Sequence, residues 1–163
     1  MDEPTIERRP EQPYAGTRAV MSMNDFPDEI PAMTAKVLEW IDARGIRASG
    51  RPFLRYHVVD MPDRMDVELG IPIADTVLAE GSVAANVLPG GRYAVLTYLG
   101  VGNGVAANKK LIAWLTEHDE AAASHRSETG EAFEARYETF LTEARLEPDQ
   151  DKWQTEIAIK LRE

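Results

Sequence analysis

The sequence has no cysteine, only three histidines and no long apolar segment. The lack of cysteine excludes disulfides, thiolate nucleophiles and cysteine-based zinc or iron–sulfur sites. The histidines show no spacing typical of a metal site, so we expect no metal and no cofactor. No apolar run approaches the roughly 18 residues of a membrane helix, and the polar first residues do not resemble a signal peptide. We therefore expect a cytoplasmic protein that does not contact a membrane.

Basic residues are also scarce. The formal net charge is -10, from 18 Lys and Arg against 28 Asp and Glu. This charge repels phosphate backbones and no basic stripe offsets it, which disfavours direct nucleic-acid binding. A neutral or cationic ligand is compatible with such a field. The 163 residues suffice for one core, so we expect one domain that is a monomer or a homodimer.

The hydrophobic pattern predicts the same series of elements twice, namely strand, helix, strand, strand. In the first half these elements are expected over 14–23, 31–43, 53–60 and 65–73. In the second half they are expected over 83–100, with a break at Pro89, and over 107–117, 135–141 and 155–161. The polar stretch 117–131 is interpreted as a loop or a helix extension. Residues 1–9 are predicted to be a flexible tail, and residues 10–163 to be the domain.

Short segments of the two halves also match in order. Trp40 and Trp114 each lie in the middle of a predicted helix among aliphatic residues. The segment Leu-Arg-Tyr56-His matches the segment Ala-Arg-Tyr137-Glu of the second half. This favours a duplicated β-α-β-β unit, with repeats over about 10–80 and 81–163. We predict an α+β fold: a mostly antiparallel sheet, two main helices on one face, and a pseudo-twofold cleft between the repeats. In this register His57 takes the place of Glu138, so both should face equivalent regions.

Glu138 is the unusual residue of the second half. It is a carboxylate in the middle of a strand whose other residues favour a pleated, half-buried sheet. Either it points to solvent, as polar residues of an alternating strand do, or it marks a site. In an apolar, aromatic cleft the carboxylate would favour a cationic ligand or act as a general acid or base.

Several segments together resemble a known family. They are Leu-Pro-Gly-Gly-Arg-Tyr-Ala-Val-Leu-Thr-Tyr-Leu-Gly100, the helix with Ala-Trp-Leu, Arg-Tyr-Glu138-Thr-Phe-Leu, and Asp-Lys-Trp153-Gln-Thr-Glu-Ile-Ala-Ile. In this order, from about Tyr14 to Leu161, they resemble the GyrI-like family. These domains also occur as effector-binding domains at the C-termini of AraC-type and MerR-type multidrug regulators. The fold of that family agrees with the duplicated sheet predicted above.

The resemblance implies a pocket between the halves, with an acid at its floor that meets lipophilic or cationic compounds. Glu138 matches the acid, and Tyr98, Tyr137 and Trp153 match its aromatic walls. Further candidate ligand-binding residues are Tyr56 and His57. Many family members have a histidine before a Gly-Pro pair where this chain has Tyr98-Leu-Gly-Val, so polar contacts there are expected to differ.

Three functions follow from the resemblance. The first is a multidrug-binding protein that takes up a lipophilic or cationic toxin, as in detoxification. The second is a hydrolase that opens cyclopropane-type or other strained rings, in which Glu138 activates water and Tyr98 or Tyr137 steadies the leaving group. The third is a protein-binding protector or inhibitor of a DNA enzyme such as gyrase. The chain has no room for a DNA-binding module, so we expect a stand-alone domain.

Overall fold

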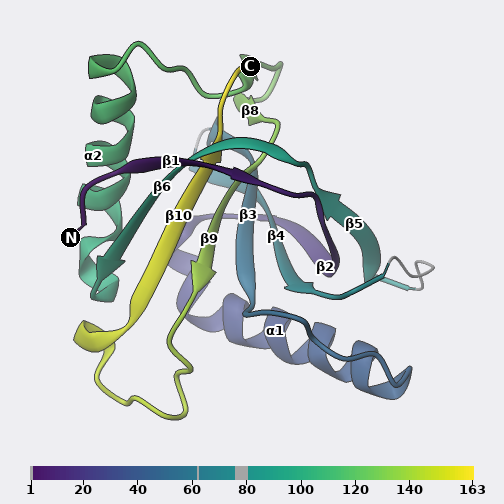
Figure 1. Cartoon of the computed structure of the whole chain (residues 1–163). Helices are drawn as coiled ribbons and strands as arrows, with labels where there is room; N and C mark the ends of the chain where they lie inside the picture. Colours follow the sequence, from purple (N-terminus) through teal and green to yellow (C-terminus); the bar gives the residue numbers. More distant parts are fainter. Residues whose placement is uncertain (1, 62, 76–80) are drawn as a thin grey trace.

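An antiparallel sheet of ten strands carries the fold in this computed structural model, which describes residues 2–61, 63–75 and 81–163 (Figure 1). Eight strands follow one another in the order β1-β6-β10-β9-β3-β4-β2-β5, and a hairpin of β7 and β8 joins the sheet where β8 pairs with β3. The bounds of the strands are β1 Thr5–Arg9, β2 Gln12–Met21, β3 Phe53–Met61, β4 Arg64–Pro72, β5 Ala84–Leu88, β6 Gly91–Leu99, β7 Ser124–Arg126, β8 Glu131–Phe133, β9 Arg136–Phe140 and β10 Gln154–Lys160.

Two α-helices cover one face of this sheet. Helix α1 (Phe26–Ala43) packs on β4 and β2, and helix α2 (Gly104–Glu117) packs on β6. Each helix buries one narrow stripe, spaced as expected for an amphipathic helix. The stripes are Met33, Val37 and Ile41 in α1, and Ala107, Leu111 and Leu115 in α2. Short 3-10 turns, η1 (Met23–Asp25) and η2 (Val101–Asn103), precede the helices, and η3 (Gln150–Lys152) precedes β10.

Both helices begin earlier than the predicted residues 31 and 107. Helix α1 starts at Phe26, with a proline in its first turn. Prolines fit there because the first N–H groups of a helix have no partner within the helix. Pro31, which the sequence placed near the start, lies inside α1 instead.

The strand order is symmetric about the central pair of β9 and β3. On either side follow β10 and β4, then β6 and β2, and finally β1 and β5. The predicted order β-α-β-β occurs twice, as β2-α1-β3-β4 and as β6-α2-β9-β10, the latter with β7 and β8 inserted. The α+β prediction is therefore confirmed. The boundary predicted between the repeats, at residues 80 and 81, lies partly outside the described residues.

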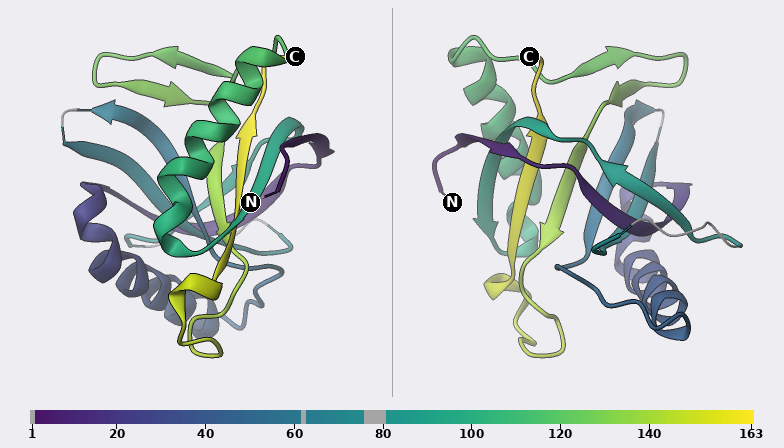
Figure 2. Two further views of the ribbon diagram at one scale, coloured as in Figure 1. Left: turned by 90° about the vertical axis from the view of Figure 1, so that its left-hand side faces the viewer. Right: turned by 45° about the vertical axis from the view of Figure 1, so that its right-hand side comes forward.

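The two ends of the sheet approach each other because the sheet curls. Strands β1 and β2 stand near opposite ends of the strand order, yet only two residues join them, and the same holds for β5 and β6. Such short links span about 10 Å, so the ends must be close, as both views of Figure 2 show. Inside the curl lies an apolar cluster that includes Tyr14, Phe53, Leu88, Tyr93 and Tyr137.

Two predictions for polar segments were wrong. Residues 1–9 were expected to be a flexible tail, but Thr5–Arg9 form β1 and pair with β6 from Thr5↔Val95 to Arg9↔Gly91. Residues 117–131 were expected to be a loop or a helix extension, but they contain β7 and the start of β8. Strand β1 pairs with a strand far along the chain, and β7 and β8 have only three residues each. Local periodicity therefore gives no signal for these strands.

Within the described ranges, neither helix offers an apolar stretch of the length needed to traverse a bilayer.

Candidate functional site

Glu138 lies in the middle of the sheet, on the face that the helices cover. Directly paired residues of neighbouring strands point to the same face, and one such row is Leu96, Ile157, Glu138, Leu54 and Leu69. Leu96 and Ile157 belong to the core under α2, and Leu54 and Leu69 to the core under α1. Glu138 is the one charged side chain in this apolar row, and it is only 8% exposed.

Tyrosine hydroxyls are the polar partners of the Glu138 carboxylate. Tyr98 on β6 donates a hydrogen bond to Glu138 Oε1 across β10, at 3.0 Å. Burial raises the pKa of Tyr98, and the negative charge of Glu138 raises it further. Burial likewise raises the pKa of Tyr56 on β3, to which the charge of Glu138 and a hydrogen bond with it also contribute. Both phenols therefore remain protonated donors at neutral pH.

A guanidinium stands near this carboxylate. Arg136 lies two residues before Glu138 on β9 and so on the same face. It donates to Asn108 Oδ1 of α2 at 2.9 Å, and its guanidinium lies 4.8 Å from the ring centre of Phe133. Burial lowers the pKa of Arg136, against the opposing influence of the Glu138 charge. Arg136 is thus anchored to α2 and to β8, and no ion pair within 4.0 Å joins the Glu138 carboxylate to any other described residue.

Tyr137 does not join this group, because it faces the interior of the curl. Its ring packs against Phe53 at 5.4 Å and Tyr93 at 5.9 Å between centroids, and its hydroxyl accepts a hydrogen bond from Arg9 at 2.9 Å. Trp153 is half-buried in the connection between β9 and β10, and its indole N–H donates to the Glu147 carbonyl at 2.7 Å. Of the predicted site residues, the structure therefore brings Glu138, Tyr98 and Tyr56 together.

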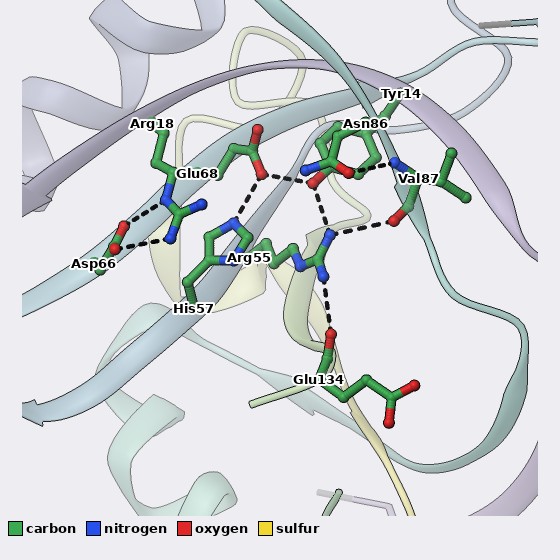
Figure 3. Close-up of polar contacts among 9 residues, drawn as sticks. All are labelled: Tyr14, Arg18, Arg55, His57, Asp66, Glu68, Asn86, Val87 and Glu134. Atoms are coloured by element: carbon green, nitrogen blue, oxygen red, sulfur yellow. Dashed lines mark hydrogen bonds and ion pairs between the residues drawn. The ribbon is translucent and has the colours of Figure 1, made fainter. Parts of the chain in front are cut away.

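His57 also lies on the interior face, beside a carboxylate that the sequence analysis missed. His57 Nε2 is 2.8 Å from Glu68 Oε1, and the same oxygen accepts a hydrogen bond from the Tyr14 hydroxyl at 2.5 Å. Arg55 donates to the Tyr14 hydroxyl at 2.9 Å and to the carbonyls of Val87 and Glu134. Figure 3 shows these side chains converging on Glu68, whose exposed fraction is 3%.

Glu68 stays ionised in this network. Burial alone would raise the pKa of Glu68, but hydrogen bonds from His57 and Tyr14 outweigh burial, so that the pKa lies below its ordinary value. Glu68 carried no special signal in the sequence, because it takes the polar position between Val67 and Leu69 in an alternating strand, where a carboxylate is expected to face solvent. The register that equated His57 with Glu138 does not hold, because the two residues point to opposite faces.

Glu138 lines neither of two cavities that open on the surface of the described residues. The first, of about 290 Å³, lies inside the curl and is lined by Arg9, Pro10, Gln12, Arg51, Phe53, Pro72, Leu88, Pro89, Tyr93, Tyr137, Thr139 and Glu156. The second, of about 430 Å³, lies by the β7–β8 hairpin and is lined by Ala123, Ser124, His125, Phe133, Glu134 and Arg162. Side chains cover Glu138, so a ligand that reached it would have to displace some of them.

In residues 2–61, 63–75 and 81–163, no three His, Asp or Glu side chains come together as a group that could hold a metal ion.

Comparisons with known proteins give one family and a shared fold. The sequence model of the GyrI-like small molecule binding domain matches residues 2–162. No protein with a curated description matches the chain.

Solved structures of EcmrR share the fold at low sequence identity to this chain. The structure of EcmrR in complex with DNA has a TM-score of 0.82 at 19% identity, covering 99% of this chain and 57% of that one. This chain therefore spans little more than half of EcmrR. The isolated EcmrR C-terminal domain has a TM-score of 0.78 at 19% identity, covering 99% of this chain and 98% of that one.

Two further structures are similar at 12% identity. A hydrolase from Listeria innocua has a TM-score of 0.64, covering 98% of this chain and 92% of that one. SAV2435 bound to tetraphenylphosphonium has a TM-score of 0.59, covering 99% of this chain and 94% of that one. At these identities the likeness shows a common fold.

Proposed function

This chain belongs to the family of GyrI-like small molecule binding domains, and from that premise we propose that it binds lipophilic or cationic compounds at Glu138, between α1 and α2. The observation that carries the proposal is the position of Glu138. An ionised carboxylate in an apolar row is costly to bury unless a cation or several donors compensate it. The Tyr98 hydroxyl supplies one donor, and Tyr56 lies close enough for the Glu138 charge to raise its pKa, but no cation lies within ion-pair distance in the described chain.

A lipophilic cation suits this site both by its charge and by its apolar groups. Its charge would compensate the carboxylate, and its apolar groups would pack against the surrounding rings and aliphatic side chains, with cation–π attraction of roughly 0.5–2 kcal/mol. SAV2435, which shares the fold, binds tetraphenylphosphonium, and this compound is therefore the probe of choice here. The ligand would lie over β9 and β3, after displacing side chains such as Tyr56 and Tyr98.

Calorimetric titration with tetraphenylphosphonium tests the proposal. We expect saturable binding by the unaltered protein and at least about a tenfold weaker affinity for Glu138→Gln, because a unit charge pair in a partly buried site is worth several kcal/mol before desolvation. The exposed Glu39→Gln on α1 removes the same charge from the acidic surface and serves as the matched control. Triphenylphosphine oxide, an uncharged analogue, should bind both variants alike. Equal affinity of tetraphenylphosphonium for the unaltered protein and Glu138→Gln would refute the assignment.

One contact favours a second function, the hydrolysis of strained electrophilic rings. Glu138 lies 3.0 Å from the hydroxyl of Tyr98, whose raised pKa keeps it protonated. Such a pair supplies an acceptor and a donor side by side. Glu138 would take a proton from water as the water oxygen bonds to a ring carbon, and Tyr98 would give its proton to the carbon released by cleavage of the ring bond. Tyr137, the other predicted donor, faces the opposite side of the sheet.

Product formation under excess of a cyclopropane-bearing electrophile separates the two functions. An enzyme gives many turnovers, and Tyr98→Phe then lowers kcat by roughly 10²–10⁴-fold with KM little changed. A binding protein depletes the compound at most stoichiometrically. Turnover that survives in both Tyr98→Phe and Glu138→Gln would exclude this mechanism.

A further inference from the structure

The cavity inside the curl of the sheet lies on the face opposite Glu138. Two short connections contribute to its lining, the link from β1 to β2 at Pro10 and the link from β5 to β6 at Pro89. The connections touch each other, because a Cβ added to Gly90 would lie 3.0 Å from the backbone nitrogen of Glu11 and 3.3 Å from the carbonyl oxygen of Arg9. The volume of about 290 Å³ is at the lower end of the range for small-molecule sites.

Aromatic rings fixed by hydrogen bonds form the floor of this cavity. Phe53 and Tyr93 are each 1% exposed and flank Tyr137 at 5.4 and 5.9 Å. The hydroxyl of Tyr93 donates to the Pro89 carbonyl at 2.5 Å, and that of Tyr137 accepts from Arg9 at 2.9 Å. The three rings line the cavity but are largely covered, with Tyr137 6% exposed, so a flat ligand would have to move neighbouring side chains aside to lie against them.

Two arginines line the cavity, and they differ in whether a carboxylate pairs with them. Arg9 is neutralised, because its guanidinium contacts Glu156 Oε1 at 2.8 Å and Glu7 Oε1 at 2.5 Å. Arg51 is half-buried and donates its Nε–H to the Phe140 carbonyl at 3.0 Å, but no carboxylate of the described chain lies within 4.0 Å of it. A carboxylate brought by a ligand would therefore be the first to pair with Arg51 among the described residues around the cavity.

We propose that this cavity is a second ligand site, which takes a small aromatic monoanion such as an aryl carboxylate. The ring of the ligand would lie on the floor of Phe53, Tyr93 and Tyr137, and its carboxylate would accept hydrogen bonds from the guanidinium of Arg51. Guanidinium groups bind carboxylates through two parallel hydrogen bonds. Glu156 at the rim, paired with Arg9, disfavours a ligand with a second negative charge.

Titration with naphthalene-2-carboxylate and with its uncharged amide tests this site. We expect Arg51→Gln to bind the carboxylate at least about tenfold more weakly while its affinity for the amide is unchanged. The exposed Arg47→Gln changes the net charge equally and should bind the carboxylate like the unaltered protein. Thr139→Phe, which fills the cavity from its wall, should lose both ligands, and thermal melting of each variant reports whether it is folded.

The outcome is independent of the site at Glu138. Glu138→Gln should leave naphthalene-2-carboxylate binding unchanged, even if tetraphenylphosphonium binding fails altogether. The proposal is overturned if the carboxylate does not bind saturably to the unaltered protein, if Arg51→Gln and Arg47→Gln bind it equally, or if Glu138→Gln rather than Arg51→Gln removes binding.

Discussion

Replacing Glu68 with glutamine should destabilise the protein by about 2–3 kcal/mol at pH 7. The carboxylate accepts two hydrogen bonds at one oxygen, from Tyr14 at 2.5 Å and from His57 at 2.8 Å. Hydrogen bonds to a charged group contribute roughly 1 kcal/mol more than bonds between neutral groups, and glutamine keeps the shape while removing the charge. For a chain of this length, the loss corresponds to a melting temperature lower by roughly 5–10 °C.

The destabilisation should depend on pH in a defined direction. The folded-state pKa of Glu68 lies below its value of 4.5 in the unfolded chain, so its stabilisation is complete above that pH and is lost as the pH falls through the folded-state pKa. Urea unfolding at pH 7 and pH 3 measures the difference between the two proteins. We expect the difference to shrink at pH 3.

The matched control lies on the same strand. Asp66 forms an ion pair with the half-exposed Arg18 at 2.8 Å, and a pair so accessible to solvent contributes about 0–1 kcal/mol. Asp66→Asn should therefore cost less than Glu68→Gln. Equal costs for the two variants, or a Glu68→Gln cost that is the same at both pH values, would refute the account of a buried charged network.

Four further predictions concern packing, the edge of the sheet, the polar contact at Glu138 and the ionisation of the tyrosines. Gly70→Ala should cost about 1–3 kcal/mol in urea unfolding, because the new Cβ would lie 2.5 Å from Phe53 Cζ, whereas Gly102→Ala, with nothing within 4 Å, should cost less. Deleting β1 should raise hydrogen exchange at the edge of β6 that pairs with it; unchanged protection there would contradict the pairing. Tyr98→Phe should cost about 1–3 kcal/mol, because the buried Glu138 carboxylate loses a donor. The folded protein should also ionise fewer tyrosines at pH 11 than the denatured chain, as ultraviolet absorbance would show, since burial raises the pKa of Tyr98.

The elements with strong periodicity were predictable from the sequence. The stripes of both helices and the alternating strands of both repeats contain enough apolar residues at regular spacing to identify their type and order. Strand β1 was not predictable, because its five residues TIERR are polar and mostly exposed. It is ordered by pairing with β6, some 85 residues away along the chain, and such a contact leaves no mark on local composition.

The candidate site was predictable in part. Glu138 was found because a carboxylate interrupts a strand, and Tyr98 through the family resemblance. The match between Tyr56 and Tyr137 was misleading, because Tyr56 packs in the core under α1 and Tyr137 in the core inside the curl. A shift of one residue in register exchanges the two faces of a strand, and aromatic residues occur on both faces here. Similar residue types at matching sequence positions therefore do not determine to which face of the sheet a side chain points.

Each half of the molecule pairs with an outer strand that belongs to the other half in sequence. The stability of one half therefore depends on the other. The four-element unit that begins at β2 is flanked by β5, which comes later in the chain, and the unit that begins at β6 is flanked by β1, which comes earlier. A fragment containing only one unit would expose a bare strand along its rim and would tend to aggregate there. Unfolding should accordingly proceed as a single event for the whole molecule, and two separately produced fragments should regain structure only when mixed.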